Sequence, residues 1–331
     1  MKTKKLKDNI IKENATFRYL RPQRKKSLVK KVLAVVVNVV YRLLIRLDPP
    51  KREQKRKYHI SLCIMFKDEA PYLREWIEYH RMIGVDHFYM YDNNSSDGFE
   101  AILALYRDSG LVTLIPWPRQ HAQVDGYEDC IRRFQSESDW IGFIDVDEFL
   151  VPVEEDSLAP ILDRFRHCPS VLVYWRFFGS GGMLRRDRSR LVIEDFVVAS
   201  EKLYTKGKCF FNSNYDYLWD HEKNKSMFHE LWTVSHGIAI PPVDIFGHTT
   251  LWSWYQASGT KNIPMQLNHY AVKSLEEHRE KNQKGDPYYD HPTHGDEVFF
   301  GRDRRCEVPD FHIFKYLSAL KIRLDQAGPD E

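Results

Sequence analysis

Strand-like and helix-like segments alternate regularly over residues 58–144 of this 331-residue chain. Four apolar runs are typical of buried strands: residues 58–66, 86–92, 111–117 and 140–144. Three segments between them space their apolar residues at helical intervals: 70–84, 99–106 and 126–134. Strands that alternate with helices are joined by right-handed crossovers and form a mostly parallel, twisted sheet. The predicted fold class is therefore α/β, with helices flanking such a sheet.

Polar side chains follow three of these strands at the point where each strand ends. They form the clusters Lys67–Glu69, Asp92–Asp97 and Asp145–Glu148. In open α/β sheets, ligands bind at the carboxyl ends of the strands. We therefore expect the three clusters to converge on one crevice.

The cluster "DVDE" places Asp145, Asp147 and Glu148 within four residues, directly after an apolar run. Strand alternation would send Asp145 and Asp147 to the same side, where two unneutralised carboxylates would raise the pKa of one of them. A divalent ion such as Mg²⁺ or Mn²⁺ removes that cost and can also bind phosphate oxygens, so a nucleotide diphosphate is a suitable ligand. The alternative is a strand-end cap, in which the carboxylates accept backbone N–H bonds. The chain contains neither G-x-x-x-x-G-K-[ST] nor G-x-G-x-x-G, which disfavours ATP-loop and dinucleotide sites.

The net charge of +2 hides a basic N-terminal arm, because residues 1–57 hold 19 Lys/Arg against 4 Asp/Glu. Such an arm fits a polyanion, either a membrane surface or nucleic acid. Within it, residues 32–41 form a charge-free core of only ten residues, whereas a membrane span needs about 20. No small-residue cleavage site follows, which argues against a signal peptide. We expect a basic amphipathic helix on an anionic membrane surface; a helix packed on the domain's own surface is the alternative.

Five scattered cysteines without a C-x-x-C pair predict neither a zinc cluster nor a disulfide framework, and they favour a reducing compartment.

Six motifs occur in an order that resembles glycosyltransferase family 92, also called domain of unknown function 23, and its bacterial relatives. They are "FKDEAPYLREWIEYHRMIGVDHFYMYDNNSSD" (66–97), "DCIRRF" (129–134), "WIGFIDVDEFL" (140–150), "WRFFGSGG" (175–182), "KSM" (225–227) and "NHYAVKSLEEHREK" (268–281). The resemblance covers about residues 60–281 and departs at Met183, where a His is expected, and over 212–236, where the match is loose. It implies a GT-A fold, a UDP-sugar donor, dependence on Mn²⁺ or Mg²⁺, and inversion at the anomeric carbon.

The resemblance also implies roles for individual residues. Asp145 and Asp147 would hold the metal, completed by His269, while Asp92 would receive the uracil or ribose and Glu69 would line the nucleotide pocket. Simpler explanations exist, since Asp92 could cap its turn, Glu69 could cap the following helix, and a lone His is often a packed core residue. Glu148 is expected to point away from the crevice.

The segment after His269 offers groups for the diphosphate. Lys273 supplies a point charge and Ser274 begins a helix whose N-terminus attracts phosphate. The alternative is a capping box between Ser274 and Glu277 on a solvated helix, and both can hold at once.

An inverting transfer also needs a general base. Of the acidic residues Asp216, Asp220, Glu222 and Glu230, we favour Glu230, against the alternative of an exposed helix carboxylate.

The predicted organisation is a basic arm (1–57), a GT-A catalytic domain (58–281) and a C-terminal extension packing on it (282–331). The predicted function is transfer of a sugar, galactose by family analogy, from a UDP-sugar to a glycan or glycolipid acceptor in surface polysaccharide synthesis. The enzyme would be cytoplasmic and peripheral at the inner face of the membrane, without a nucleic-acid partner. One alternative is a nucleotidyltransferase, although "KDEAPYL" stands where that class carries a Gly- and Lys/Arg-rich loop. The other is a non-enzymatic polyanion-binding protein.

Overall fold

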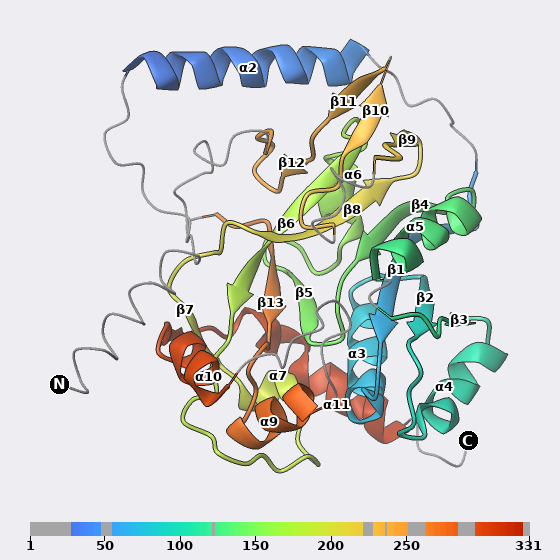
Figure 1. The fold of residues 1–331 in the computed structure, drawn as a ribbon, viewed down its shortest axis with the longest axis vertical. Coiled ribbons are helices and arrows are strands. Elements are labelled where there is room, and N and C mark those ends of the chain that lie inside the picture. The colour runs from blue at the N-terminus through green and yellow to red at the C-terminus, as the bar shows by residue number, and fades with distance from the viewer. Residues whose placement is uncertain are drawn as a thin grey trace.

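The computed structural model of the chain describes residues 28–47, 55–120, 123–220, 228–235, 237–250, 262–283 and 295–326. A curled nine-stranded sheet runs through these residues, with helices flanking it (Figure 1). Parallel strand pairs outnumber antiparallel ones. The predicted α/β class, with a mostly parallel sheet and flanking helices, is confirmed.

The N-terminal half of the sheet is wholly parallel, in the order β3-β2-β1-β4. Its strands are β1 (Tyr58–Phe66), β2 (His87–Asp92), β3 (Val112–Pro116) and β4 (Ser138–Phe143). Its helices are α3 (Ala70–Met82), α4 (Phe99–Asp108) and α5 (Gln123–Phe134). All seven predicted elements are present, with boundaries that differ by a few residues.

The other half of the sheet is mixed and continues in the order β4-β8-β6-β13-β5. Its strands are β5 (Glu148–Pro152), β6 (Ser170–Phe177), β8 (Gly207–Asn212), β12 (Val243–Asp244) and β13 (Met265–His269). Strand β13 lies between β5 and β6, antiparallel to the first and parallel to the second. A late segment of the chain is thereby placed beside the acidic turn that joins β4 to β5.

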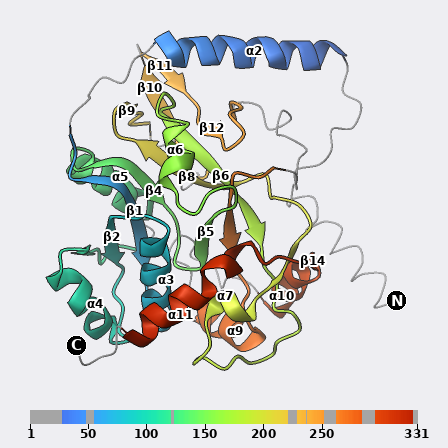
Figure 2. The ribbon, with the colours of Figure 1, turned by 180° about the vertical axis from the view of Figure 1, so that it is seen from behind.

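Smaller elements complete the described fold. They are α6 (Ala159–Asp163), α7 (Val192–Asp195), β7 (Val198–Ser200), β9 (Asp216–Tyr217), β10 (Thr233–Ser235), β11 (Ile238–Ile240), α9 (Leu275–Gln283), α10 (Asp296–Asp303), β14 (Cys306–Pro309), η2 (His312–Tyr316) and α11 (Leu317–Gln326). The view from behind shows α11 crossing the molecule near α3 (Figure 2). Arg74 of α3 donates to the carbonyl of Leu324, and Arg323 pairs with Glu78 of α3. Strand β14 pairs with β7.

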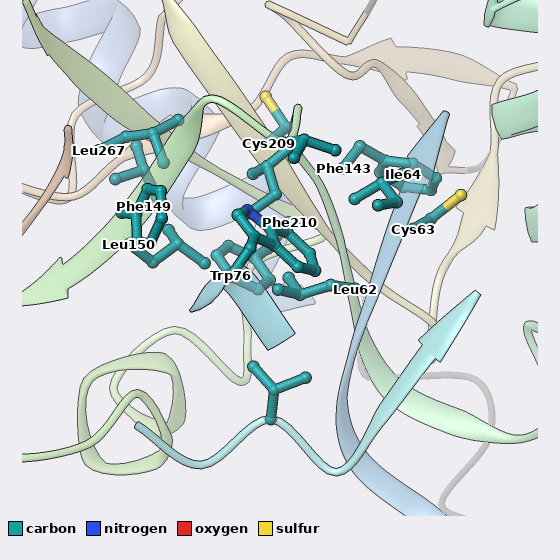
Figure 3. Close-up of a cluster of buried hydrophobic side chains, with 14 of the residues drawn as sticks. Leu62, Cys63, Ile64, Trp76, Phe143, Phe149, Leu150, Cys209, Phe210 and Leu267 are labelled. Carbon is teal, nitrogen blue, oxygen red and sulfur yellow. The ribbon is translucent and has the colours of Figure 1, made fainter. Parts of the chain in front are cut away.

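The core beneath the acidic turn is aromatic and aliphatic and includes Trp76, Phe149 and Phe210 (Figure 3). Gly142 of β4 is required there, because a Cβ atom would lie 2.5 Å from Phe210 Cε1 and 2.7 Å from Leu62 Cδ2. Trp76 Nε1 donates to the carbonyl of Glu148 at 2.8 Å. Helix α3 therefore holds the start of β5 in place through both packing and a hydrogen bond.

Helix α2 (Leu28–Leu47) lies at one end of the molecule, apart from the sheet (Figure 1). It attaches through Asn38, whose Oδ1 accepts bonds from the amide and hydroxyl of Thr249, and through Arg42, which donates to the carbonyl of Gly247. The predicted helix is thus confirmed, and one face packs on the protein's own surface. Of the helices within the described ranges, none has the length and apolar character needed to cross a bilayer. Residues 1–27 and 48–54 of the basic arm lie outside these ranges.

Candidate active site

Asp145 lies in the turn after β4 and is held by three side chains. Lys208 Nζ lies 3.0 Å from its Oδ2, while Gln123 Nε2 and Tyr127 OH lie 3.0 and 3.2 Å from its Oδ1. Burial would raise the pKa of Asp145, as does the charge of Asp147, but the Lys208 ammonium outweighs both and lowers it. Asp145 is therefore an ionised carboxylate whose charge is already matched by a lysine.

Asp147 lies two residues further on, and its two carboxylate oxygens face different partners. Oδ1 lies 3.6 Å from His269 Nε2, and Oδ2 accepts a hydrogen bond from Lys281 Nζ at 2.5 Å. Burial opposes ionisation, but Lys281 and His269 hold the pKa of Asp147 well below its usual range. Burial also lowers the pKa of His269, against the attraction of Asp147, so the imidazole is poised as a neutral ligand.

Glu148 is fully buried, and its carboxylate accepts hydrogen bonds from Trp175 Nε1 at 2.7 Å and from the backbone amide of Asp145 at 3.0 Å. Burial raises its pKa well above the usual range, and the nearby charge of Asp145 adds to this. Glu148 is expected from the sequence to point away from the crevice; the structure instead places one of its oxygens within 4.8 Å of candidate ligand atoms of Asp147 and His269. The register of β13 against β5 places it directly opposite His269.

Asp147, Glu148 and His269 form a candidate metal site, because one potential ligand atom from each lies within 4.8 Å of the others. Two carboxylates and an imidazole suit Mn²⁺, and carboxylate oxygens suit Mg²⁺. His269 Nδ1 is buried without a hydrogen-bond partner among the described residues, so the ring is not committed to a structural bond through that atom. The donor set therefore fits a divalent ion.

A small pocket that is open to solvent lies beside this site. Glu69, Tyr72, Lys273 and Lys281 are among its lining residues. Glu69 makes no side-chain cap to α3, and its Oε2 is buried without a hydrogen-bond partner in the described part of the chain. Lys273 is buried with its Nζ 3.6 Å from the centre of the Tyr72 ring, and burial lowers its pKa. The pocket lining thus combines two lysines with three glutamates, Glu69, Glu277 and Glu280, of which Glu69 has the uncommitted oxygen.

Ser274 and Glu277 form the predicted capping box at the start of α9. Ser274 Oγ donates to Glu277 Oε2 at 2.6 Å, the amide of Ser274 donates to the same oxygen at 3.1 Å, and the amide of Glu277 donates to Ser274 Oγ at 3.2 Å. The interaction fixes the helix that carries Lys281.

Comparison with known proteins identifies the family. Residues 56–240, more than half of the chain, match the model of Glycosyltransferase family 92. The chain belongs to glycosyltransferase family 92. The predicted enzyme class, a glycosyltransferase, is confirmed at the level of the family.

Plant proteins are among the relatives of this family 92 chain. A glycosyltransferase family 92 protein of Arabidopsis thaliana is 36% identical over 133 residues, which cover 39% of this chain and 23% of the relative. The galactan beta-1,4-galactosyltransferase GALS1 of the same plant is 31% identical over 107 residues, covering 29% of this chain and 21% of the relative. The chain thus spans under a quarter of the length of these two relatives. Among solved structures, TarS 1–349 of S. aureus in complex with UDP aligns with a TM-score of 0.32 and 12% identity over 47% of each chain.

The fold of this family 92 chain brings together only some of the predicted site residues. Asp147 and His269 meet at the candidate metal site, and Glu69 and Lys273 line the adjoining pocket. Asp145 pairs instead with Lys208.

Asp92 accepts a hydrogen bond from the amide of Ser95 at 2.9 Å, as expected for a residue that caps its turn. The neighbouring clusters do meet, since Asp97 accepts a bond from the amide of Ala70, and Asp68 accepts one from the amide of Ser96.

The favoured catalytic base, Glu230, is exposed and lies in a turn rather than a helix. It follows His229, whose ring packs 4.8 Å from that of Trp175 and whose pKa is lowered to about 3 by burial and by Lys208. Of the other candidates, Asp216 belongs to strand β9 and Glu222 lies outside the described residues.

Two lysines of the site escaped the sequence predictions. Lys208 belongs to the apolar strand "GKCFFN", where a single Lys among buried residues is a usable signal of an internal counter-charge. Lys281 is the last residue of the motif "NHYAVKSLEEHREK", and its sequence context is typical of an ordinary charged residue on a solvated helix.

Proposed function

We propose that the protein transfers a sugar from a UDP-sugar to a glycan or glycolipid acceptor and depends on Mn²⁺ or Mg²⁺. The observation that carries the proposal is the meeting of Asp147, Glu148 and His269 beside a pocket lined by Lys273 and Lys281. Ligands for a hard cation next to ammonium groups suit a metal-bound diphosphate. Membership of glycosyltransferase family 92 supports a sugar as the transferred group.

Asp147 and His269 would hold the ion, with Glu148 as the third ligand present in the same group. When bound, the ion would supply positive charge that stabilises the departing diphosphate. Lys273 would contribute a further charge on the pocket side, and Glu69, with its uncommitted oxygen, would accept a hydrogen bond from the donor. Asp145, already neutralised by Lys208, would orient the turn, and Asp92 would face the nucleoside.

The sugar, the stereochemistry and the pathway class are proposed from the relatives. Galactose is the proposed sugar, because relatives include proteins named galactan beta-1,4-galactosyltransferase, at 29% to 31% identity over about a third of this chain. Inversion with Glu230 as the general base is proposed on the same family analogy. Surface polysaccharide synthesis is the proposed pathway class.

Calorimetric titration of UDP in the presence of Mn²⁺ tests the donor site. The wild type should bind UDP only when Mn²⁺ is present, and Asp147→Asn should lose this binding. Asp156→Asn is the matched control, because the Asp156 side chain is 98% exposed and pairs with Lys315 outside the site. Binding that is undiminished in Asp147→Asn would overturn the proposal. A UDP-release assay across a panel of UDP-sugars would then identify the donor, and release of pyrophosphate from a nucleoside triphosphate instead would favour a nucleotidyltransferase.

We also propose that α2 binds an anionic membrane, on the inner, cytoplasmic face of that membrane. Eight large apolar residues of this helix are 47% to 74% exposed: Val32, Leu33, Val35, Val36, Val39, Val40, Leu43 and Leu47. Helical spacing puts Val36, Val40, Leu43 and Leu47 opposite Asn38 and Ile45, the buried residues that attach the helix to the protein. Arg46 is exposed on the same helix, and the arm around it is strongly basic, as expected for a helix lying among anionic headgroups.

Flotation with phosphatidylglycerol vesicles tests this surface. The double variant Val36→Glu/Leu43→Glu should fail to float, whereas Leu105→Glu, at an equally exposed leucine of α4, should float with the vesicles like the wild type. Equal recovery of all three proteins would contradict membrane binding through α2.

A further inference from the structure

Lys281 and the candidate metal site share one carboxylate. Lys281 Nζ lies 2.5 Å from Asp147 Oδ2, while Oδ1 of the same group faces His269 Nε2 at 3.6 Å. An ion bound between Asp147 and His269 would therefore have an ammonium group as a near neighbour. Like charges at such a distance repel, so this lysine opposes the binding of a bare cation.

The position of Lys281 is fixed by the helix that carries it. The Ser274–Glu277 capping box anchors the start of α9. The two residues before Lys281 are tied to other segments, since Arg279 pairs with Asp296 and Glu280 pairs with Arg188. The backbone of Lys281 is consequently fixed near Asp147 by the fold, and the ion pair itself places the ammonium group.

Lys281 differs from the other two lysines near the acidic turn in its access to the pocket. Its side chain is 51% exposed, whereas the Asp147 side chain is 7% exposed. Lys208 is buried beneath Asp145, and Lys273 is buried over the ring of Tyr72. Of these three lysines, Lys281 alone combines contact with a candidate metal ligand and an open side toward the pocket.

We propose that Lys281 sets a preference at this centre. A divalent ion binds more tightly together with a diphosphate than it does alone. The inference rests on the proposed function and adds a residue that determines binding order. With a bare ion, the Lys281 charge cancels part of the attraction of Asp147. With a diphosphate present, the same ammonium donates to a phosphate oxygen, and the added negative charge turns the repulsion into a net attraction.

The variant Lys281→Gln separates the two effects, because it removes the charge and keeps a polar side chain of similar length. Two titrations are required: Mn²⁺ alone, and UDP in saturating Mn²⁺. Relative to the wild type, we expect Lys281→Gln to bind Mn²⁺ alone about tenfold more tightly and UDP with Mn²⁺ about tenfold more weakly. Lys281→Arg should stay close to the wild type in both titrations, and Lys321→Gln, which breaks a surface pair with Glu194, should change neither.

The inference is supported only if Lys281→Gln binds Mn²⁺ alone more tightly and UDP with Mn²⁺ more weakly than the wild type. If Lys281→Gln weakens both, Lys281 only orients Asp147 and the inference is overturned; unchanged affinities in both overturn it as well. If the wild type binds UDP with Mn²⁺ but the two affinities of Lys281→Gln do not change in opposite directions, this inference alone is defeated. A wild type that does not bind UDP at any Mn²⁺ concentration defeats the proposed function and the inference together. A thermal melt of each variant, expected to match the wild type within a few degrees, confirms that the titrations compare folded proteins.

Discussion

Lys208 Nζ lies 3.0 Å from Asp145 Oδ2, beneath the acidic turn. The lysine belongs to β8, is 2% exposed, and is separated in sequence from the aspartate by three strands (β5, β6 and β7) and two short helices (α6 and α7). Burial would lower the pKa of Lys208, but Asp145 and Glu148 outweigh it and raise the pKa. The pair stays charged, and one acidic residue of the turn is neutralised without a metal.

Replacing Lys208 by Met should destabilise the protein by about 3–5 kcal/mol, because it leaves a carboxylate without its counter-charge. Adding Asp145→Asn should recover part of that loss. Urea denaturation of the two single variants and the double variant forms the cycle that measures the coupling. Additive losses in the double variant would show that the pair contributes no coupling energy.

Replacing Ser274 by Ala should cost about 1 kcal/mol, since it removes the hydroxyl of the capping box. Ser274→Thr should retain most of the stability because its hydroxyl can make the same bonds. Ser318→Ala, at an exposed position of α11, serves as the control and should change stability by less than about 0.5 kcal/mol. Denaturant midpoints measure all three, and equal midpoints for the two alanine variants would contradict the role of the cap.

Glu75 should make stability depend on pH. Its buried carboxylate accepts bonds from the amides of Val192 and Ile193, and burial, although opposed by these bonds, raises its pKa from 4.5 to about 7. Because the folded state binds this proton more tightly than the unfolded state, the stabilisation is fully present below about pH 4.5 and is lost as the pH rises to about 7. The change amounts to at most about 3 kcal/mol.

Glu75→Gln should therefore flatten the pH dependence of the melting temperature between pH 5 and pH 8. Glu100→Gln, at an exposed position of α4, should leave the wild-type curve unchanged. Parallel curves for the wild type and Glu75→Gln would rule out this carboxylate as the source.

Gly142→Ala should destabilise the protein by about 1–3 kcal/mol, because the new methyl group would press on the rings and methyl groups of Phe210 and Leu62. The measurement is the denaturant midpoint. An alanine variant as stable as the wild type would mean that β4 and its neighbours can separate at this point.

The parallel half of the fold was predictable because its signals are local. The strand Tyr58–Phe66 was predicted at its exact boundaries, and the Ser274–Glu277 capping box follows from two residues three positions apart. The insertion of β13 between β5 and β6 was not predictable from such signals. It depends on pairing between Glu148 and His269, which are more than a hundred residues apart.

The error over Glu148 has a local cause. Alternation of side chains holds only within a strand, and β4 ends at Phe143. Asp145 and Asp147 belong to a turn closed by a bond from the amide of Glu148 to the carbonyl of Asp145. Strand alternation therefore does not govern where these three carboxylates point.

The position of β13 determines when the candidate catalytic centre can assemble during synthesis of the chain. A nascent chain that has emerged only as far as residue 240 contains the acidic turn and the whole family-matched region, but it still lacks His269 and Lys281. Until β13 enters the gap between β5 and β6, the edges of those strands have no partner there, and the turn has no imidazole opposite it. The candidate catalytic centre is thus among the last parts of the molecule to exist.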